Sequence, residues 1–269
     1  MSAHLVTFAD ESMSRAAELC VDSALQHGVI RGCAVGPSMR PYTWEWLLNE
    51  TDFKAGHSAE FLNGRGLAFW SWKPFIIDHA MRQLPDGFHL VYADAGVEFI
   101  NNVSHVIDRM DQEVFLFGNN WEHAHWCKRD VIDAVWPAPS NSGHNENERV
   151  PGWWRFGKQC QASVIFFRVS DYSRKFVKEW LDWCLFEGGR LIDDSPSRAP
   201  NHPEFQEHRH DQAILTTLAY REGIKLHWWP ASYNDGAFAY EKLPCYAGDN
   251  YPVMFNHHRK RNHEFTEAA

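Results

Sequence analysis

The first hundred residues alternate short apolar runs with segments of helical spacing. Residues 5–9 form an apolar run that ends at Asp10, and residues 12–26 place apolar and small side chains at helical spacing before Gly28. Residues 29–35 form a second apolar run. A strand, a helix and a strand in this order predict two parallel strands joined by a right-handed crossover.

The clearest helix is predicted over residues 72–84, where the apolar side chains fall on one face and Pro74 suits the first helical position. A turn at residues 85–87 follows. Residues 88–93 are then almost continuously apolar, as expected of a strand that is buried on both faces, and the run ends at Asp94. The pattern therefore places an acid directly after a buried strand.

The second half of the chain continues this alternation. Apolar runs at residues 114–117 and 162–169 predict strands, and helical spacing at residues 176–185 and 211–221 predicts helices. Together with the earlier elements, they predict one α/β domain with a mostly parallel central sheet flanked by helices.

The domain is expected to span residues 1–255. The remaining residues, 256–269, begin with a basic run that has no apolar face, so we expect them to form a C-terminal tail.

Three polar segments with Gly or Pro are predicted loops, at residues 49–66, 136–157 and 188–207. We place the first over the carboxyl ends of the strands, and the second is a candidate for a flexible lid. Loops longer than about 12–15 residues in a compact domain are usually functional or disordered. The two longest loops therefore favour an enzyme with a covered site.

Composition narrows the range of ligands. The chain has 269 residues, which fits one large α/β domain or two small ones, and its formal net charge is -9. This charge argues against bulk nucleic acid or an anionic membrane as a partner. The thirteen Trp suit a sugar or a nucleotide, which flat aromatic faces recognise, although packing is the more common role of any single Trp.

The six Cys give no Cys-x-x-Cys spacing, which disfavours a zinc ribbon or a redox motif. Several lie in apolar runs, where free Cys behaves as a small hydrophobe, as in a reducing compartment. The N-terminus has no signal-peptide pattern, and no apolar stretch approaches the length of a membrane span. We therefore expect a cytoplasmic protein without a transmembrane segment.

Asp94 is the first candidate for chemistry. Open α/β sheets bind ligands at the carboxyl ends of their strands, and an Asp there can hold a divalent cation that bridges phosphates. Gly96 would let the backbone come close to a ligand. The alternative is a turn Asp that caps its own backbone, but the direct continuation of the strand into Asp94 favours a ligand site.

Lys73 lies at the start of the predicted helix, where the helix dipole disfavours a cation. A bound anion would remove that conflict because the ammonium and the helix N-terminus would both face it, and a diphosphate is the natural candidate. A solvent-exposed Lys with a small tolerated penalty explains the pattern equally well.

Residues 207–212 read Glu-His-Arg-His-Asp-Gln and concentrate ionisable groups at the start of another predicted helix. Asp211 could act as a general base or hold a sugar hydroxyl, and it could equally cap the helix. The density of charge in six residues favours a functional role.

Residues 256–261 read Asn-His-His-Arg-Lys-Arg. His257 or His258 could complete a metal site, and the cations could neutralise phosphate, with a solvated basic tail as the alternative. His123 and His125 are weaker metal candidates because no third ligand is evident nearby.

Taken together, these segments resemble the GT-A-fold glycosyltransferases, and the resemblance covers most of the chain. The matching stretches are Thr7-Phe8-Ala9, Gly66 through Trp70-Ser71-Trp72-Lys73-Pro74-Phe75-Ile76-Ile77, Tyr92-Ala93-Asp94-Ala95-Gly96, and Asp194-Ser195-Pro196-Ser197 through Phe205-Gln206-Glu207-His208-Arg209-His210-Asp211-Gln212.

The resemblance implies a single GT-A-like domain, related to the Rossmann fold, with a nucleotide-diphosphate sugar as donor. The first strand would hold the base, Lys73 would approach the diphosphate, and Asp94 with His257 would bind Mn²⁺ or Mg²⁺. Asp211 and Gln212 are similar to the start of the Asp-Gln-Asp motif in retaining enzymes of the glycogenin type. The implied donor-binding residues are Thr7, Phe8, Ala9, Trp72, Lys73, Asp94, Ala95 and Gly96.

The chain departs from that pattern at two positions. Gly96 stands where a second metal-binding Asp is expected, and Ala213 is the third residue of the Asp-Gln-Asp pattern. The first departure bears on whether a metal is required, and the second bears on the stereochemistry of transfer.

We expect the chain to transfer a sugar from a nucleotide-diphosphate sugar to a hydroxyl of a glycan or similar acceptor, as in polysaccharide biosynthesis. Asp211 would be the base of an inverting enzyme, whereas Gln212 or Asp211 would support the oxocarbenium-like state of a retaining one. Two alternatives are a metal-dependent hydrolase that uses the segments around His123, His208 and His257, and a non-catalytic nucleotide-sugar-binding module.

Overall fold

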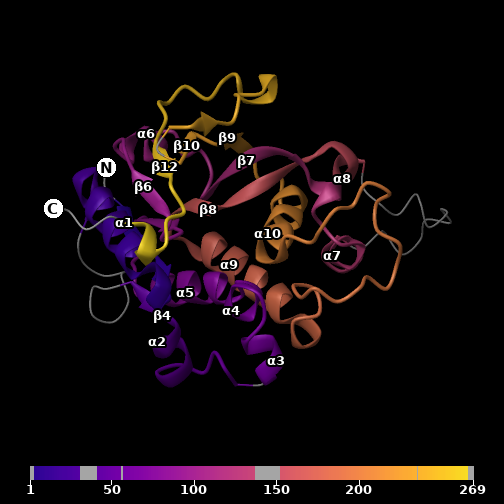
Figure 1. Cartoon of the computed structure of the whole chain (residues 1–269). Coiled ribbons are helices and arrows are strands. Elements are labelled where there is room, and N and C mark those ends of the chain that lie inside the picture. The colour runs from indigo at the N-terminus through magenta and orange to yellow at the C-terminus, as the bar shows by residue number, and fades with distance from the viewer. Residues whose placement is uncertain (1–2, 31–40, 56, 137–151, 235, 266–269) are drawn as a thin grey trace.

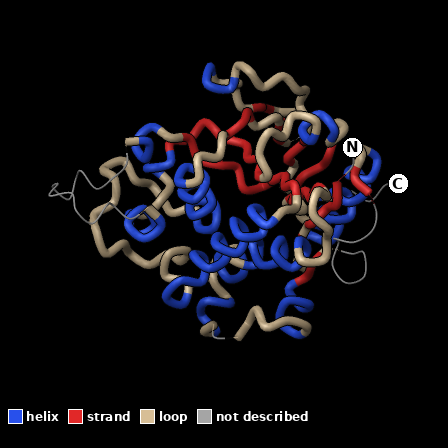
Figure 2. The backbone as a smooth tube through the Cα atoms, turned by 180° about the vertical axis from the view of Figure 1, so that it is seen from behind, coloured by secondary structure: helices blue, strands red, loops and turns tan. Residues whose placement is uncertain are grey.

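The structure is a computed structural model in which the strands lie at the centre of the molecule and helices pack against them (Figure 1, Figure 2). It describes residues 3–30, 41–55, 57–136, 152–234 and 236–265. Residues 31–35 of the second predicted strand and residues 137–151 of the candidate lid lie outside these ranges.

The main sheet has six strands in the order β3-β1-β5-β8-β7-β9. Their bounds are Val29–Ile30 (β3), Ala3–Val6 (β1), His89–Ala93 (β5), Lys158–Arg168 (β8), Val114–Glu122 (β7) and Leu226–Trp228 (β9). β1 pairs in parallel with β3 and β5, and β7 pairs in parallel with β9, whereas β8 is antiparallel to β5 and β7. The prediction of an α/β fold with a mostly parallel central sheet is confirmed, and β8 is its reversed strand.

Helices cover this sheet on both faces. The helices are α1 (Ser14–Gln26), α2 (Trp44–Asn49), α3 (Ala59–Leu62), α4 (Gly66–Phe69), α5 (Trp72–Met81), α6 (Ser104–Ile107), α7 (Arg129–Val135), α8 (Trp153–Phe156), α9 (Asp171–Leu185) and α10 (His210–Arg221). Among the helices that the structure describes, none is long and apolar enough to span a bilayer.

The core divides along the alternation of β5. Leu90 and Tyr92 belong to a cluster with the apolar faces of α5, α9 and α10, whereas Val91 and Ala93 belong to a second cluster with α1 and α6. All four side chains are completely buried. Successive residues of a strand point to opposite faces, so burial on both faces explains the nearly continuous apolar run of this segment.

A smaller sheet lies beyond Asp94 and has the order β11-β10-β12-β6. Its strands are Phe238–Ala239 (β11), Ala231–Tyr233 (β10), Phe255–His257 (β12) and Val97–Phe99 (β6). β12 is antiparallel to β6, with His257 opposite Val97, so the end of the chain returns to the turn that follows Asp94. The tail expected from residue 256 therefore begins inside a strand in which Asn256 and His257 are buried.

Two predicted loops contain short helices that the sequence pattern did not indicate. The segment 49–66 includes α3, where Ser58 caps the first turn and Phe61 is buried. The segment 136–157 includes α8, which buries Trp154 against the core. These helices are too short to show a periodicity, and tertiary contacts of one aromatic residue each stabilise them. The predicted loop at residues 188–207 is described throughout and contains no helix or strand except at Gly188, which ends a 3-10 helix (Phe186–Gly188).

The predicted strand at residues 5–9 is divided into β1 and a short strand, β2 (Phe8–Ala9). β2 leaves the main sheet and pairs in parallel with β4 (Tyr42–Thr43). A 3-10 turn, η1 (Glu11–Met13), then leads into α1. The chain thus bends away from the sheet at Thr7, and this bend opens space above the ends of β1 and β5.

Candidate active site

A cavity of about 570 Å³ opens at the carboxyl ends of β1 and β5, which is the usual position of ligand sites in α/β sheets. Its volume lies within the range of small-molecule sites. The lining residues come from six segments: Phe8, Ala9, Asp10 and Met13; Gly64, Arg65, Gly66, Leu67, Trp70, Trp72 and Lys73; Asp94, Ala95 and Gly96; Ala162 and Ser163; Arg209, His210, Asp211 and Gln212; and His257, Arg259 and Arg261.

This cavity brings together ten of the eleven residues that were predicted to bind the donor, to act in catalysis or to bind a metal with Asp94. The exception is Thr7, which is buried and does not line the cavity. The others are Phe8, Ala9, Trp72, Lys73, Asp94, Ala95, Gly96, Asp211, Gln212 and His257. Their chemical roles stay predictions.

A buried lysine between two carboxylates forms the floor of the cavity. Lys73 Nζ lies 3.3 Å from Asp94 Oδ1 and 3.4 Å from Asp211 Oδ2, and it donates a hydrogen bond to the Ala162 carbonyl at 3.1 Å. The Lys73 side chain is 4% exposed, whereas that of Asp94 is 32% exposed. An isolated buried ammonium would be very costly, so the two acids are what permit Lys73 at this position.

Three elements place these groups. Lys73 is in the first turn of α5, Asp94 directly follows β5, and Asp211 is in the first turn of α10. Tyr92 lies two residues before Asp94, and its hydroxyl donates a 2.6 Å hydrogen bond to Asp94 Oδ1. The expected solvent-exposed alternative for Lys73 is therefore wrong, because the side chain points into the protein and not away from it.

The electrostatics of the cluster follow from burial. Burial raises the pKa of Asp211 to about 6, and the nearby Asp94 adds to the rise while Lys73 opposes it. For Lys73, burial alone would lower the pKa, but Asp211 and Asp94 outweigh it, so the pKa is raised. Lys73 is thus charged at neutral pH, whereas the pKa of Asp211 lies close to neutral pH.

Gln212 is held by the reversed strand β8. Its Oε1 accepts a 3.4 Å hydrogen bond from the backbone N–H of Ala162, and its Nε2 donates to Gln159 Oε1 at 2.6 Å. Both partners lie in β8. A side chain fixed at both ends of its amide is well suited to present one face to a ligand.

Strained backbone surrounds the cavity. Four consecutive residues from Leu67 to Trp70 have positive φ, as do His210 and Arg259. Of the eight non-glycine residues with positive φ in the described ranges, four line the cavity, namely Leu67, Trp70, His210 and Arg259. Such conformations cost roughly 1–3 kcal/mol each and cluster at functional sites, so they support this cavity as the site.

The left-handed turn packs against an aromatic wall. Trp72 stacks on Phe8, with ring centroids 3.9 Å apart, and its indole N–H donates to the Gly66 carbonyl at 3.0 Å. Gly66 has φ +65°, and a Cβ there would lie 2.2 Å from the indole of Trp70. Gly66 is therefore required both by its backbone conformation and by the close approach of Trp70.

Five cationic side chains and three carboxylates line the cavity. The cations are Arg65, Lys73, Arg209, Arg259 and Arg261, and the acids are Asp10, Asp94 and Asp211. The chain as a whole carries a formal net charge of -9. A cavity with an excess of positive charge in an acidic protein favours an anionic ligand.

The residues nominated for a metal form an incomplete donor set. Asp94 and His257 both line the cavity, and burial lowers the pKa of His257 to about 3, so its imidazole is neutral. A side chain at Gly96 would meet the backbone of Arg259, whose Cα lies 3.0 Å from the position of a Cβ. In the described residues, Asp94 and His257 do not join a third His, Cys, Asp or Glu in a group with the spacing of metal ligands. These two donors alone do not fit a divalent cation site of the expected kind.

The histidines of the hydrolase alternative are engaged elsewhere. His123 Nε2 lies 3.1 Å from Thr217 Oγ1, and His208 Nε2 lies 2.9 Å from the Leu191 carbonyl oxygen. Burial lowers the pKa of both imidazoles. Neither residue lines the cavity with His257. The structure does not assemble them into a metal centre.

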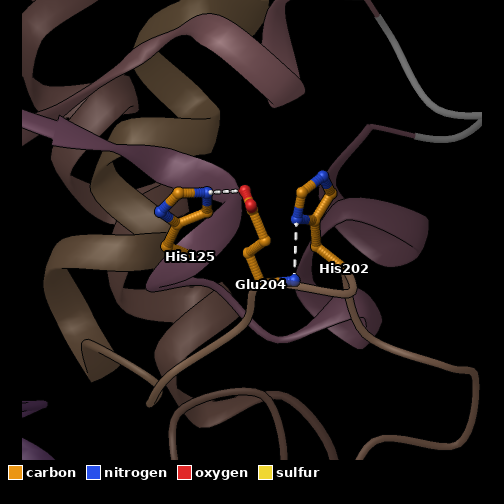
Figure 3. Close-up of side chains that lie close together, drawn as sticks. All are labelled: His125, His202 and Glu204. Carbon is orange, nitrogen blue, oxygen red and sulfur yellow. Dashed lines mark hydrogen bonds and ion pairs between the residues drawn. The ribbon is translucent and has the colours of Figure 1, made fainter.

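His125 instead lies beside two residues of the long loop at residues 188–207, namely His202 and Glu204 (Figure 3). Its Nε2 is 2.9 Å from Glu204 Oε2, and His202 Nδ1 accepts a 3.3 Å hydrogen bond from the Glu204 backbone N–H. Potential ligand atoms of the three residues lie within 4.8 Å of one another. The third partner of His125 was not evident in the sequence because it is nearly eighty residues away. None of the three lines the cavity.

The sequence assigned no individual role to Tyr92, Arg65 or Arg209. Alternation along a strand places residues two apart on the same side, so the Tyr92 contact with Asp94 could have been inferred. Arg209 could not: its guanidinium lies over the rings of Trp121 and Trp126 and forms an ion pair with Glu207 at 2.8 Å. These contacts depend on the fold.

Solved structures with a similar fold include a sugar transferase. The chain superposes on the galactosyltransferase LgtC in complex with donor and acceptor sugar analogues, with a TM-score of 0.51, 12% identity, and coverage of 96% of this chain and 87% of that chain. An active-site mutant of LgtC, in which a Gln is replaced by Glu, gives a TM-score of 0.50 with the same identity and coverage. No protein-family model matches the sequence, and no curated protein matches it. The chain thus has the GT-A-type glycosyltransferase fold.

Proposed function

We propose that this protein transfers a sugar from a nucleotide-diphosphate sugar to a hydroxyl of a glycan or similar acceptor. The observation that carries the proposal is the buried Lys73 between Asp94 and Asp211, at the base of a positively charged cavity at the strand ends. The LgtC structure holds donor and acceptor sugar analogues on the same fold, which supports this class of reaction.

The donor diphosphate would lie close to Lys73 and to the arginines that line the cavity. Transfer breaks the bond between the anomeric carbon and the diphosphate oxygen, and the electron pair leaves with the diphosphate. Lys73 and the arginines at the rim would stabilise that developing charge. Charge stabilisation by groups that are already in place is usually the largest contribution to such catalysis.

The sugar would lie beside Asp211. The ring carbon develops positive charge as the bond breaks, and the Asp211 carboxylate is buried close to the cavity surface. With a pKa of about 6, Asp211 is mostly ionised at neutral pH but remains basic enough to accept a proton. In an inverting reaction it would take the proton of the acceptor hydroxyl.

Gln212 has a separate role in the proposal. Its fixed amide lines the cavity beside Asp211 and would support the oxocarbenium-like state of a retaining reaction. LgtC also has an active-site Gln, which was replaced by Glu in one of its structures, and this supports a role for a Gln in the proposed site. The configuration of the product's anomeric carbon, measured by NMR, decides between the two roles.

Two measurements test the function. Calorimetric titration with UDP-sugars and GDP-sugars should give binding, and incubation with candidate acceptor glycans should release the nucleoside diphosphate. Asp211→Asn should retain donor binding within a few-fold and lose turnover by about 100-fold or more. Unchanged turnover in that variant would remove Asp211 from the mechanism. Failure of every nucleotide sugar to bind would contradict the proposed function.

A non-catalytic binding module remains a second candidate because both carboxylates are already engaged by Lys73. That reading predicts donor binding without product for every acceptor. It also predicts that Asp94→Asn and Asp211→Asn alter binding alone. Any acceptor-dependent release of nucleoside diphosphate contradicts it.

A further inference from the structure

The backbone of an arginine, Arg259, lies beside Gly96 in the cavity. At position 96, where the resemblance placed a carboxylate, the structure has no side chain, and the Arg259 backbone fills the space instead. The Arg259 N–H donates a 3.2 Å hydrogen bond to the Gly96 carbonyl. A side chain at position 96 would therefore require the segment that carries the arginine to shift by a few tenths of an ångström.

Arg259 combines a left-handed backbone with two side-chain contacts. Its φ is +57°, a left-handed conformation that is unfavourable for a non-glycine residue. Its Nε lies 3.4 Å from His257 Nε2, and its guanidinium lies 5.5 Å from the centre of the Tyr233 ring. The hydrogen bond to Nε2 occupies one of the two ring nitrogens with which His257 could bind a metal.

The charged end of Arg259 is open to a ligand. Within the described part of the chain, its guanidinium forms no ion pair with a carboxylate, in contrast to Arg65 and Arg209, which both contact Glu207. Arg261 is the second arginine after β12, and its Nη1 donates to Ser12 Oγ at 2.7 Å. Both arginines line the cavity.

We propose that Arg259, assisted by Arg261 and Lys73, binds the donor diphosphate directly and takes the place of a divalent cation. This inference rests on the proposed function. A planar guanidinium can contact two phosphate oxygens at once, and it carries a fixed charge that needs no metal. Donor binding is then independent of Mn²⁺ and Mg²⁺, and it weakens with ionic strength.

The test is calorimetric titration of the full chain with UDP and GDP, in EDTA and in Mn²⁺. We expect the same affinity in both conditions to within about threefold, because no metal bridge contributes. Arg259→Gln should weaken binding by about 10–100-fold in EDTA, as expected for loss of charge-assisted hydrogen bonds. Arg259→Lys should restore part of the loss because it keeps the charge without the bidentate geometry.

Arg82 provides the matched control. It is an exposed arginine in an ion pair with Asp78 and does not line the cavity, so Arg82→Gln should bind UDP and GDP as the unaltered protein does. Thermal unfolding of each variant shows whether it is folded. If EDTA abolishes binding that Mn²⁺ restores, or if Arg259→Gln binds normally, the inference is overturned and the proposed function stands. If neither nucleotide binds in either condition, the proposed function fails with it.

Discussion

Two buried lysines in this fold have different surroundings. Lys128 is 2% exposed and lies beneath the long loop, where its Nζ donates to the carbonyls of Arg190 and Asp193 and to Asp193 Oδ1. Lys73 is 4% exposed and donates to one carbonyl, with two carboxylates at 3.3 and 3.4 Å.

The difference lies in what surrounds the charge. Lys128 is saturated by three acceptors within one loop, so it fixes the course of residues 190–193. Lys73 is shared between Asp94 and Asp211, which come from different elements and border the cavity. A buried cation with complete partners indicates a structural role, whereas one balanced between acids at a cavity indicates a site that can respond to an anion.

The largest effect is expected from removing each lysine in turn. Lys73→Met leaves two acids without their cation, and Lys128→Met leaves Asp193 and two carbonyls without theirs. Each variant should lose about 3–5 kcal/mol of the free energy of unfolding, measured with urea. Only Lys73→Met should lose nucleotide binding. If Lys128→Met lost it to the same extent while folded, the functional distinction between the two lysines would be wrong.

The next effect is the pH dependence of stability that Asp211 gives to the Lys73 cluster. The folded state raises the pKa of Asp211 from 3.8 to about 6, so it binds a proton more tightly than the unfolded state does. Stability from this group is therefore present below pH 4 and is lost as the pH rises toward 6. Relative to Asp211→Asn, the free energy of unfolding should fall by about 3 kcal/mol across this window.

Asp193, the partner of Lys128, should behave in the opposite sense. Its pKa is lowered: burial alone would raise it, but hydrogen bonds from Ser195 and Lys128 outweigh burial. Stability from Asp193 is present above its unfolded pKa and is lost as the pH falls through the folded value. Urea titrations of Asp193→Asn and Asp211→Asn across acidic pH compare the two. Equal slopes for both would contradict the contrast.

A smaller effect is expected at the rim of the cavity. Gly66→Ala places a Cβ against the Trp70 indole in a left-handed conformation, and we expect a loss of about 1–3 kcal/mol in stability, together with weaker nucleotide binding. Gly87 also has a positive φ but meets no atom within 4 Å, so Gly87→Ala is the matched control. Its loss should be about 1 kcal/mol with binding unchanged. Comparable losses of stability in the two variants would show that the contact with Trp70 does not contribute to the effect of Gly66→Ala.

The smallest effect is expected at the surface cluster of His125, His202 and Glu204, in which Glu204 is exposed and the two histidines are half-buried. The Glu204 side chain is 70% exposed, and exposed ion pairs contribute about 0–1 kcal/mol. Glu204→Gln should therefore change the urea midpoint little and leave nucleotide binding intact. A loss as large as that of Lys73→Met would show that charge pairing matters equally at the surface and at the cavity.

Local pattern was sufficient for three of the elements that carry the site, but not for β12, whose residues 256 and 257 were expected in a tail. The apolar run before Asp94, the helical spacing after Lys73 and the helix that starts beside Asp211 all follow from hydrophobic periodicity over about ten residues. The reversed direction of β8 has no such signal, because a buried strand reads the same in either direction. Short helices such as α3 and α8 were missed because each has only about one turn.

The sequence by itself determined which acids and cations stand at the ends of strands and helices, because these positions depend on neighbouring residues. Only the tertiary structure decided that Lys73 turns inward between Asp94 and Asp211, and that the Arg259 backbone occupies the space beside Gly96. Both outcomes depend on contacts between segments more than a hundred residues apart. Burial and charge pairing are created by those contacts, and they set the pKa of Asp211 and the charge of the cavity.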